Sequence, residues 1–206
     1  MAKIGRVIRY DEVQLVQALS AETKAVRAAF AAASAERLQP LYEWFHEACG
    51  QGDPATLRAG LDAVWELVRG LPAPDGLPQL QQAAESLVPD EDDDWAEQSA
   101  YAQNAAAAVT YALGSWIDDD PQQAGWAARQ LYEAADYAAQ QEIGDLNSPG
   151  AEAALLARPV VQEALEGIQE DLRAVSRPGD PLQIAQEVRD AGRAGGAQLA
   201  GLVIGA

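Results

Sequence analysis

The chain has 206 residues, of which 49% are apolar, and a formal net charge of −18. It can therefore bury a core, while the negative charge excludes binding to nucleic acid phosphates and to anionic membranes. Cys49 is the single cysteine, which excludes an internal disulfide, and no apolar stretch reaches the ~20 residues of a membrane-spanning helix. We therefore expect a soluble cytoplasmic protein.

The composition predicts an all-α fold, because good helix formers dominate and β-branched residues are sparse. In chain order, Asp11 is expected to cap a short helix and Ser20 to cap a long helix that Pro40 interrupts. Gly50 is expected to end that segment, and Asp53-Pro54 to start the next helix with an N-cap followed by proline at the first helical position.

The second half of the chain continues the helical pattern. A loop is expected over 70–78 and a short helix over 79–87, followed by an acidic run. An alanine-rich stripe over 101–117 suits a central helix, and Asp120-Pro121 starts the following one. Two later helices are expected around 160–175 and 184–188, the last followed by a glycine-rich tail.

These elements predict a single all-α domain over residues 1–206, a bundle of about eight helices. About ten residues at each end are expected to be loosely ordered.

The negative charge is concentrated in one part of the chain. Residues 1–70 are almost neutral, whereas residues 71–157 contain sixteen acidic residues and Arg129 as the single basic one. Such a stretch can attract a basic protein or a cation, and it repels nucleic acid and anionic membranes. The alternative, which we favour, is that it is only a solvated acidic surface. The five tryptophans and the alanine-rich stripe are also compatible with a homodimer interface.

Few residues suit metal or nucleophile chemistry. Glu43 and His46 have the spacing of a helical metal-binding pair, but His46 is the only histidine and no second pair completes such a site. Nothing around Cys49 matches a nucleophilic motif. We therefore predict no catalytic residue, no metal ligand and no cofactor.

Glu36 and Arg37 follow the apolar run over 28–35, so at least one of them is expected to lie against the core. A buried charge needs a partner, and an internal ion pair that fixes the chain near Pro40 would supply one. The alternative is a polar binding pocket beside Tyr42.

The segments 35–45, 50–53 and 61–66, with Val88-Pro89 before the acidic run, resemble the bacterial family known as domain of unknown function 416. The resemblance covers roughly residues 26–205 and implies an all-helical domain with no known activity. The residues that it carries over are Glu36, Arg37, Pro40, Tyr42, Phe45, Gly52, Asp53, Trp65, Asp92 and Asp93. This chain departs from the family pattern at Asp94, Tyr101 and Asn104.

Three functions remain open at this point. The first is a non-catalytic binding or regulatory protein with an acidic docking surface, which we favour because no catalytic set is complete. The second is an enzyme with a carboxylate and arginine pocket, with or without a divalent cation. The third is an acidic neutralising or DNA-mimicking protein. The candidate binding residues are Glu36, Arg37, Tyr42, Asp92 and Asp93.

Overall fold

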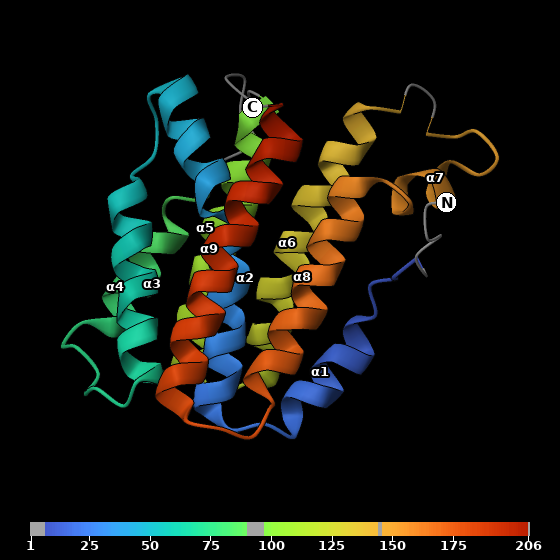
Figure 1. The fold of residues 1–206 in the computed structure, drawn as a ribbon. Coiled ribbons are helices and arrows are strands. Elements are labelled where there is room, and N and C mark those ends of the chain that lie inside the picture. The colour runs from blue at the N-terminus through green and yellow to red at the C-terminus, as the bar shows by residue number, and fades with distance from the viewer. Residues whose placement is uncertain (1–6, 90–96, 144–145, 206) are drawn as a thin grey trace.

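The computed structural model describes residues 7–89, 97–143 and 146–205. All regular structure in these ranges is helical, as predicted (Figure 1). The helices are α1 (Glu12–Ser20), α2 (Lys24–Cys49), α3 (Pro54–Val68), α4 (Leu77–Glu85), α5 (Glu97–Ile117), α6 (Pro121–Gln141), α7 (Ala151–Leu156), α8 (Pro159–Val175) and α9 (Pro181–Ile204). The described part therefore holds nine helices rather than about eight, because the short α7 was not expected as a separate element.

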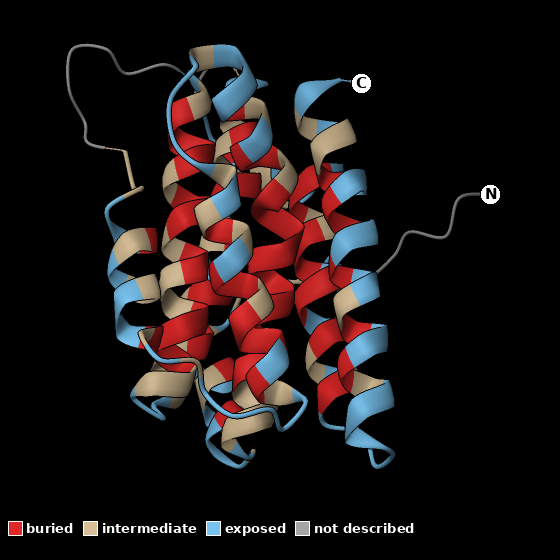
Figure 2. Ribbon diagram, turned by 90° about the vertical axis from the view of Figure 1, so that its left-hand side faces the viewer, coloured by how far each residue is buried: buried red, intermediate tan, exposed pale blue. Residues whose placement is uncertain are grey.

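Helix α2 forms the centre of the bundle and contacts α3, α5, α6, α8 and α9. Its stretch over 28–35 is buried throughout and consists of alanine apart from Phe30 and Ser34. Small side chains let helices approach from several sides, which explains why a helix with little amphipathic character occupies this position. The alanine-rich α5, which was expected to be central, packs directly against α2. Buried residues line the middle of the bundle (Figure 2).

The Asp-Pro starts are confirmed at both places where they were predicted. The Asp53 side chain accepts hydrogen bonds from the backbone N–H groups of Ala55 and Thr56, and Asp120 accepts one from Gln122. Pro54 and Pro121 occupy the first helical positions, where the missing N–H has no intrahelical acceptor. Asp11 caps α1 and Gly50 ends α2 in the left-handed conformation, both as expected.

Three predicted boundaries are wrong. Ser20 is the last residue of α1, where its hydroxyl donates to the Val16 carbonyl, and Thr23 caps α2 instead. The short helix occupies Leu77–Glu85 rather than 79–87. The glycine-rich segment after Val188 is not a tail but the second half of α9, since its glycines pack against α2.

Pro40 does not interrupt α2, contrary to the prediction. Proline in a helix interior leaves the carbonyl four residues earlier without its usual N–H donor, and here that carbonyl belongs to Glu36. Gly196 of α9 lies against the Glu36 carbonyl, where an added Cβ would be only 3.0 Å away. Close packing by α9 thus covers the position at which the helix loses a hydrogen bond.

Candidate functional site

Glu36 and Arg37 lie next to each other in the middle of α2, and both are buried. Consecutive residues of an α-helix point about 100° apart, so their side chains reach different neighbours. Glu36 meets residues of α3 and α9, whereas Arg37 meets α8 and α9. Each therefore has its own set of partners.

The Glu36 carboxylate has no exposed surface and is surrounded by donors. Arg58 Nη1 lies 2.8 Å from both of its oxygens, and the Trp65 indole Nε1 donates to Oε1 at 3.0 Å. Two arginines of α9 approach from the other side, with Arg189 Nε 3.4 Å and Arg193 Nε 3.5 Å from the carboxylate. We call Glu36, Arg58, Trp65, Arg189 and Arg193 the Glu36 cluster.

Arg37 forms a separate, two-point ion pair. Its Nε donates to Asp171 Oδ2 at 2.8 Å, and its Nη2 donates to Oδ1 at 2.9 Å. Gly167 and Gly195 line the guanidinium, because a side chain at either position would overlap it. Burial raises the pKa of Asp171, and the hydrogen bonds from Arg37 oppose that rise.

Tyr42 belongs to neither of these ion-pair sets. Its hydroxyl accepts a hydrogen bond from the Asp53 backbone N–H at 3.3 Å, and burial raises its pKa. Gly52, with a positive φ of 75°, lies directly over that hydroxyl, where a Cβ would collide with it. Tyr42 therefore fixes the loop before α3.

The predicted site residues do not form one pocket in the described part of the chain. No hydrogen bond or ion pair among the described residues joins Glu36 or Arg37 to Tyr42. Asp92 and Asp93, together with Asp94, lie outside the described residues.

Sequence reasoning missed the partners of both charged residues. Asp171 lies one turn after Ile168 on the apolar face of α8, and a carboxylate in that position was the available signal for a buried pair. Arg189 and Arg193 are four residues apart on one side of α9, but nothing in the sequence linked them to α3.

Two half-buried tyrosines of α6, Tyr132 and Tyr137, each have carboxylates near them. Burial raises the pKa of Tyr132, with further contributions from Asp136, Glu152 and Glu133. Burial likewise raises the pKa of Tyr137, and Glu97 adds to the effect. We call these residues of α5, α6 and α7 together the α6 acidic stripe: Glu97, Tyr132, Glu133, Asp136, Tyr137 and Glu152.

The α6 acidic stripe is continuous with buried aromatic rings. Tyr137 meets Tyr101 edge-on, with ring centroids 5.3 Å apart, and Tyr101 lies 5.8 Å from Trp44. Burial is the main cause of the raised pKa of Tyr101, and the negative charge of Glu97 adds to it. Tyr132 stacks on Tyr10 at 5.0 Å, so the half-buried tyrosines are held rigidly.

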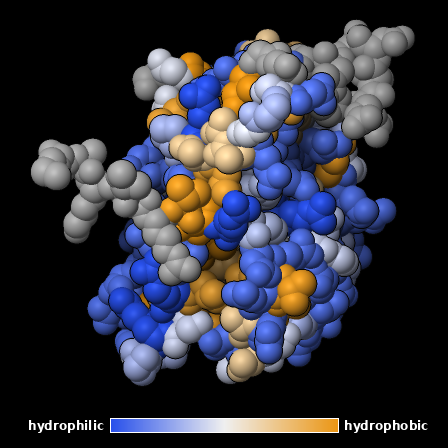
Figure 3. Space-filling model, turned by 90° about the vertical axis from the view of Figure 1, so that its right-hand side faces the viewer, coloured by the Kyte–Doolittle hydropathy of each residue, from blue (hydrophilic) through white to orange (hydrophobic). Residues whose placement is uncertain are grey.

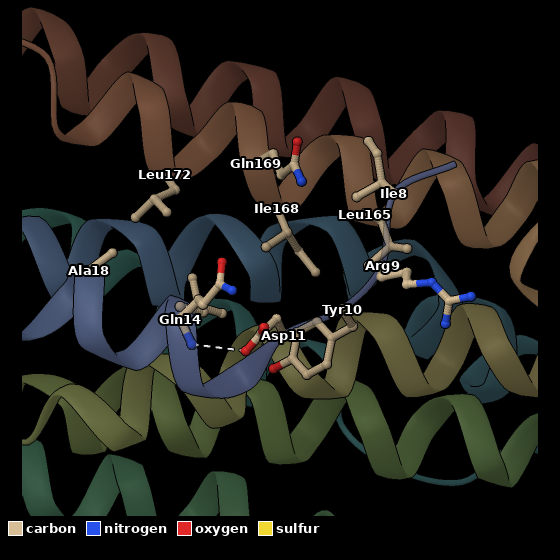
Figure 4. A pocket seen from close by; sticks show the side chains of 11 residues that line it. Ile8, Arg9, Tyr10, Asp11, Gln14, Ala18, Leu165, Ile168, Gln169 and Leu172 are labelled. Atoms are coloured by element: carbon tan, nitrogen blue, oxygen red, sulfur yellow. Dashed lines mark hydrogen bonds between the residues drawn. The ribbon is translucent and has the colours of Figure 1, made fainter. Parts of the chain in front are cut away.

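An apolar cavity of about 290 Å³ lies between α1 and α8 (Figures 3 and 4). Leu165, Ile168 and Leu172 of α8 form one wall. Two polar groups at the other wall are already used: Tyr10 donates its hydroxyl to the Gly125 carbonyl, and Asp11 caps α1. The side chains of Arg9, Gln14 and Gln169 also line the cavity.

The residues considered for metal binding are dispersed. His46 is exposed and its Nδ1 lies 2.8 Å from the Gln51 carbonyl, while Cys49 is a free, half-buried thiol. Within the described ranges, no three His, Cys, Asp or Glu side chains gather closely enough to hold a metal ion. None of the helices in those ranges has the length and apolarity needed to cross a membrane.

Comparisons with known proteins agree with the resemblance seen in the sequence. A family model described as "Protein of unknown function (DUF416)" matches residues 14–197. The crystal structure of a DUF416 family protein from Shewanella baltica OS155 has a similar fold, with a TM-score of 0.74 and 22% sequence identity. The similarity covers 85% of this chain and 91% of the Shewanella chain. No curated protein matches. The chain belongs to the DUF416 family of proteins of unknown function.

Proposed function

We propose that this chain is a non-catalytic binding protein of the bacterial cytoplasm, whose α6 acidic stripe docks a basic segment of a partner protein. The observation that carries the proposal is that each of two tyrosines on α6 has carboxylates near it: Glu133, Asp136 and Glu152 near Tyr132, and Glu97 near Tyr137. All of them come from the stretch over 71–157, which has Arg129 as its single basic residue.

Half-buried tyrosines beside carboxylates suit lysine and arginine side chains of a partner. The carboxylates attract the cation, while the aromatic rings contribute apolar contact and cation–π attraction. Part of the negative charge of the α6 acidic stripe is already balanced within the chain. Arg129 pairs with Glu133, and Nη1 of Arg9 lies 3.9 Å from Oε1 of Glu152. Glu97 and Asp136 have no ion pair among the described residues, so they are the strongest candidates for partner contacts.

The buried charges support a non-catalytic role. Glu36, Arg37 and Asp171 are the buried charged residues in the described part of the chain, and each is in an ion pair. General acid–base catalysis needs a titratable group that can reach a substrate. These groups instead join helices: Arg37 and Asp171 connect α2 to α8, and Glu36 connects α2 to α3 and α9.

The proposal can be tested by fluorescence anisotropy with a labelled lysine-rich peptide, titrated at low and at moderate salt. The informative variant is Glu97→Gln/Asp136→Asn. Its matched control is Glu166→Gln/Asp190→Asn, which changes the net charge equally at exposed positions of α8 and α9. We expect the first variant to weaken binding about tenfold, since each exposed ion pair contributes up to about 1 kcal/mol.

The control variant should change the affinity by less than about twofold, and added salt should weaken binding of the wild type. Equal weakening in both variants would mean that the peptide responds to net charge alone, which would refute a localised docking surface. Absence of binding at low salt would refute the proposal as well.

A further inference from the structure

The Glu36 cluster contains more positive than negative charge. Arg58, Arg189 and Arg193 all approach the single carboxylate of Glu36, and Asp62 forms an ion pair with Arg189. Three guanidinium groups therefore share two carboxylates. This excess is unusual in a chain with 14 basic and 32 acidic residues.

The cluster is layered, with its carboxylate inside and its guanidinium groups toward solvent. The Glu36 side chain is 0% exposed, whereas the side chains of Arg58 and Arg193 are 29% and 47% exposed. The Glu36 carboxylate lies beneath the arginines and cannot itself reach a ligand. The guanidinium groups can.

Several donors of these arginines are unused. Arg58 bonds to Glu36 through Nη1 alone, and Arg193 through Nε alone. Nη2 of Arg58 and both Nη atoms of Arg193 have no protein acceptor among the described residues. These N–H groups come from two different helices, α3 and α9.

The arginines are also held in place. Trp65 donates to Glu36 and so orients the carboxylate to which the arginines bind, and the Arg189 guanidinium lies 5.9 Å from the centre of the Trp65 ring. A binding site gains affinity when its ligand-contacting groups are already ordered by neighbouring side chains.

We infer that Arg58, Arg189 and Arg193 form a binding site for a small phosphate-bearing ligand, either inorganic phosphate or a phosphate monoester. A carboxylate offers two oxygens that lie in one plane. Phosphate instead offers oxygens in several directions, so it can accept from arginines on both α3 and α9. The site lies on α3 and α9 and is separate from the α6 acidic stripe.

The test is isothermal titration calorimetry of the whole chain with inorganic phosphate, phosphoserine and acetate at matched ionic strength. The variants are Arg193→Gln and a matched control, Arg173→Gln, which removes an exposed arginine of α8. We expect saturable binding of phosphate or phosphoserine to the wild type. Arg193→Gln should weaken it about tenfold, as expected for a lost charge-assisted hydrogen bond.

Arg173→Gln should leave the affinity within about twofold of the wild type, and circular dichroism should show that both variants are folded. Tighter binding of phosphoserine would identify a monoester ligand, and tighter binding of inorganic phosphate would identify the free anion; both support the site. The inference is wrong if neither phosphate compound binds, if acetate binds as tightly, or if Arg173→Gln loses as much affinity as Arg193→Gln.

Discussion

Arg37 and Asp171 are 134 positions apart in the chain, yet their side chains form a buried two-point ion pair with N–O distances of 2.8 and 2.9 Å. The pair joins the central helix α2 to α8. Gly167 and Gly195 provide the space that the guanidinium needs. This contact and the Glu36 cluster connect α2 to three surrounding helices through charged groups.

Removal of one partner of this pair should be far more harmful than removal of both. We expect Asp171→Leu to lower the free energy of unfolding by about 3–5 kcal/mol, because it leaves the Arg37 charge buried and unpaired. The double variant Arg37→Met/Asp171→Leu should lose less than Asp171→Leu alone, and therefore less than the sum of Arg37→Met and Asp171→Leu. Urea denaturation of the four proteins measures this, and strict additivity would show that the two side chains do not interact.

Gly195→Ala should destabilise the protein, although glycine-to-alanine changes inside helices usually stabilise by about 1 kcal/mol. An added Cβ would overlap Nη1 of Arg37 and push the guanidinium away from Asp171. We expect a loss of about 1–3 kcal/mol, typical of overpacking. Chemical denaturation provides the measurement, and an increase in stability would contradict this role of Gly195.

Trp65→Phe removes the indole donor that orients the Glu36 carboxylate while it keeps an aromatic ring in the core. We expect a loss of about 1.5–3 kcal/mol, the range for a hydrogen bond to a charged group. Glu36→Gln should cost more, about 3–5 kcal/mol, since it leaves the surrounding arginines without their shared anion. If thermal and urea denaturation rank the two variants in the opposite order, the carboxylate is not the centre of the cluster.

The N-cap of α3 should make stability depend on pH. Hydrogen bonds from the Thr56 hydroxyl and backbone hold the pKa of Asp53 below its usual range. A carboxylate with a lower pKa in the folded chain stabilises it above the unfolded pKa, and this contribution is lost as the pH falls through the folded pKa. The stability difference between wild type and Asp53→Asn should therefore be present at neutral pH and shrink in acid. A difference that stays constant across urea denaturation series from neutral to acidic pH would contradict this.

Local signals predicted the helix boundaries well wherever a capping residue, a proline or a glycine stands at the boundary itself. Asp53-Pro54, Asp120-Pro121 and Gly50 work through nearby backbone groups, so their effect can be inferred without knowledge of the fold. The prediction that Pro40 interrupts the helix was wrong because it could not include Gly196. This residue lies more than 150 positions away in the sequence and packs against the Glu36 carbonyl. The glycines of α9 were wrongly predicted to form a tail for the same reason, because their packing against α2 depends on residues far away in the sequence.

In the candidate site, too, local sequence predicted some features, whereas others depend on the packing of distant helices. The run of apolar residues before Glu36 and Arg37 predicted that at least one of them would be buried, and both are. Their partners could not be predicted, because Arg58, Asp171 and Arg189 are brought to α2 only by the packing of α3, α8 and α9. Sequence composition located the acidic stretch, but not the tyrosines near which some of its carboxylates lie.

The most direct test of the proposed docking function is NMR mapping of a lysine-rich peptide on the ¹⁵N-labelled protein. If the α6 acidic stripe is the docking surface, backbone signals of Glu97, Asp136 and Tyr137 should shift in a saturable way, while those near Glu166 and Asp190 should not. Shifts spread evenly over the exposed acidic residues, or concentrated on α8 and α9, would contradict it.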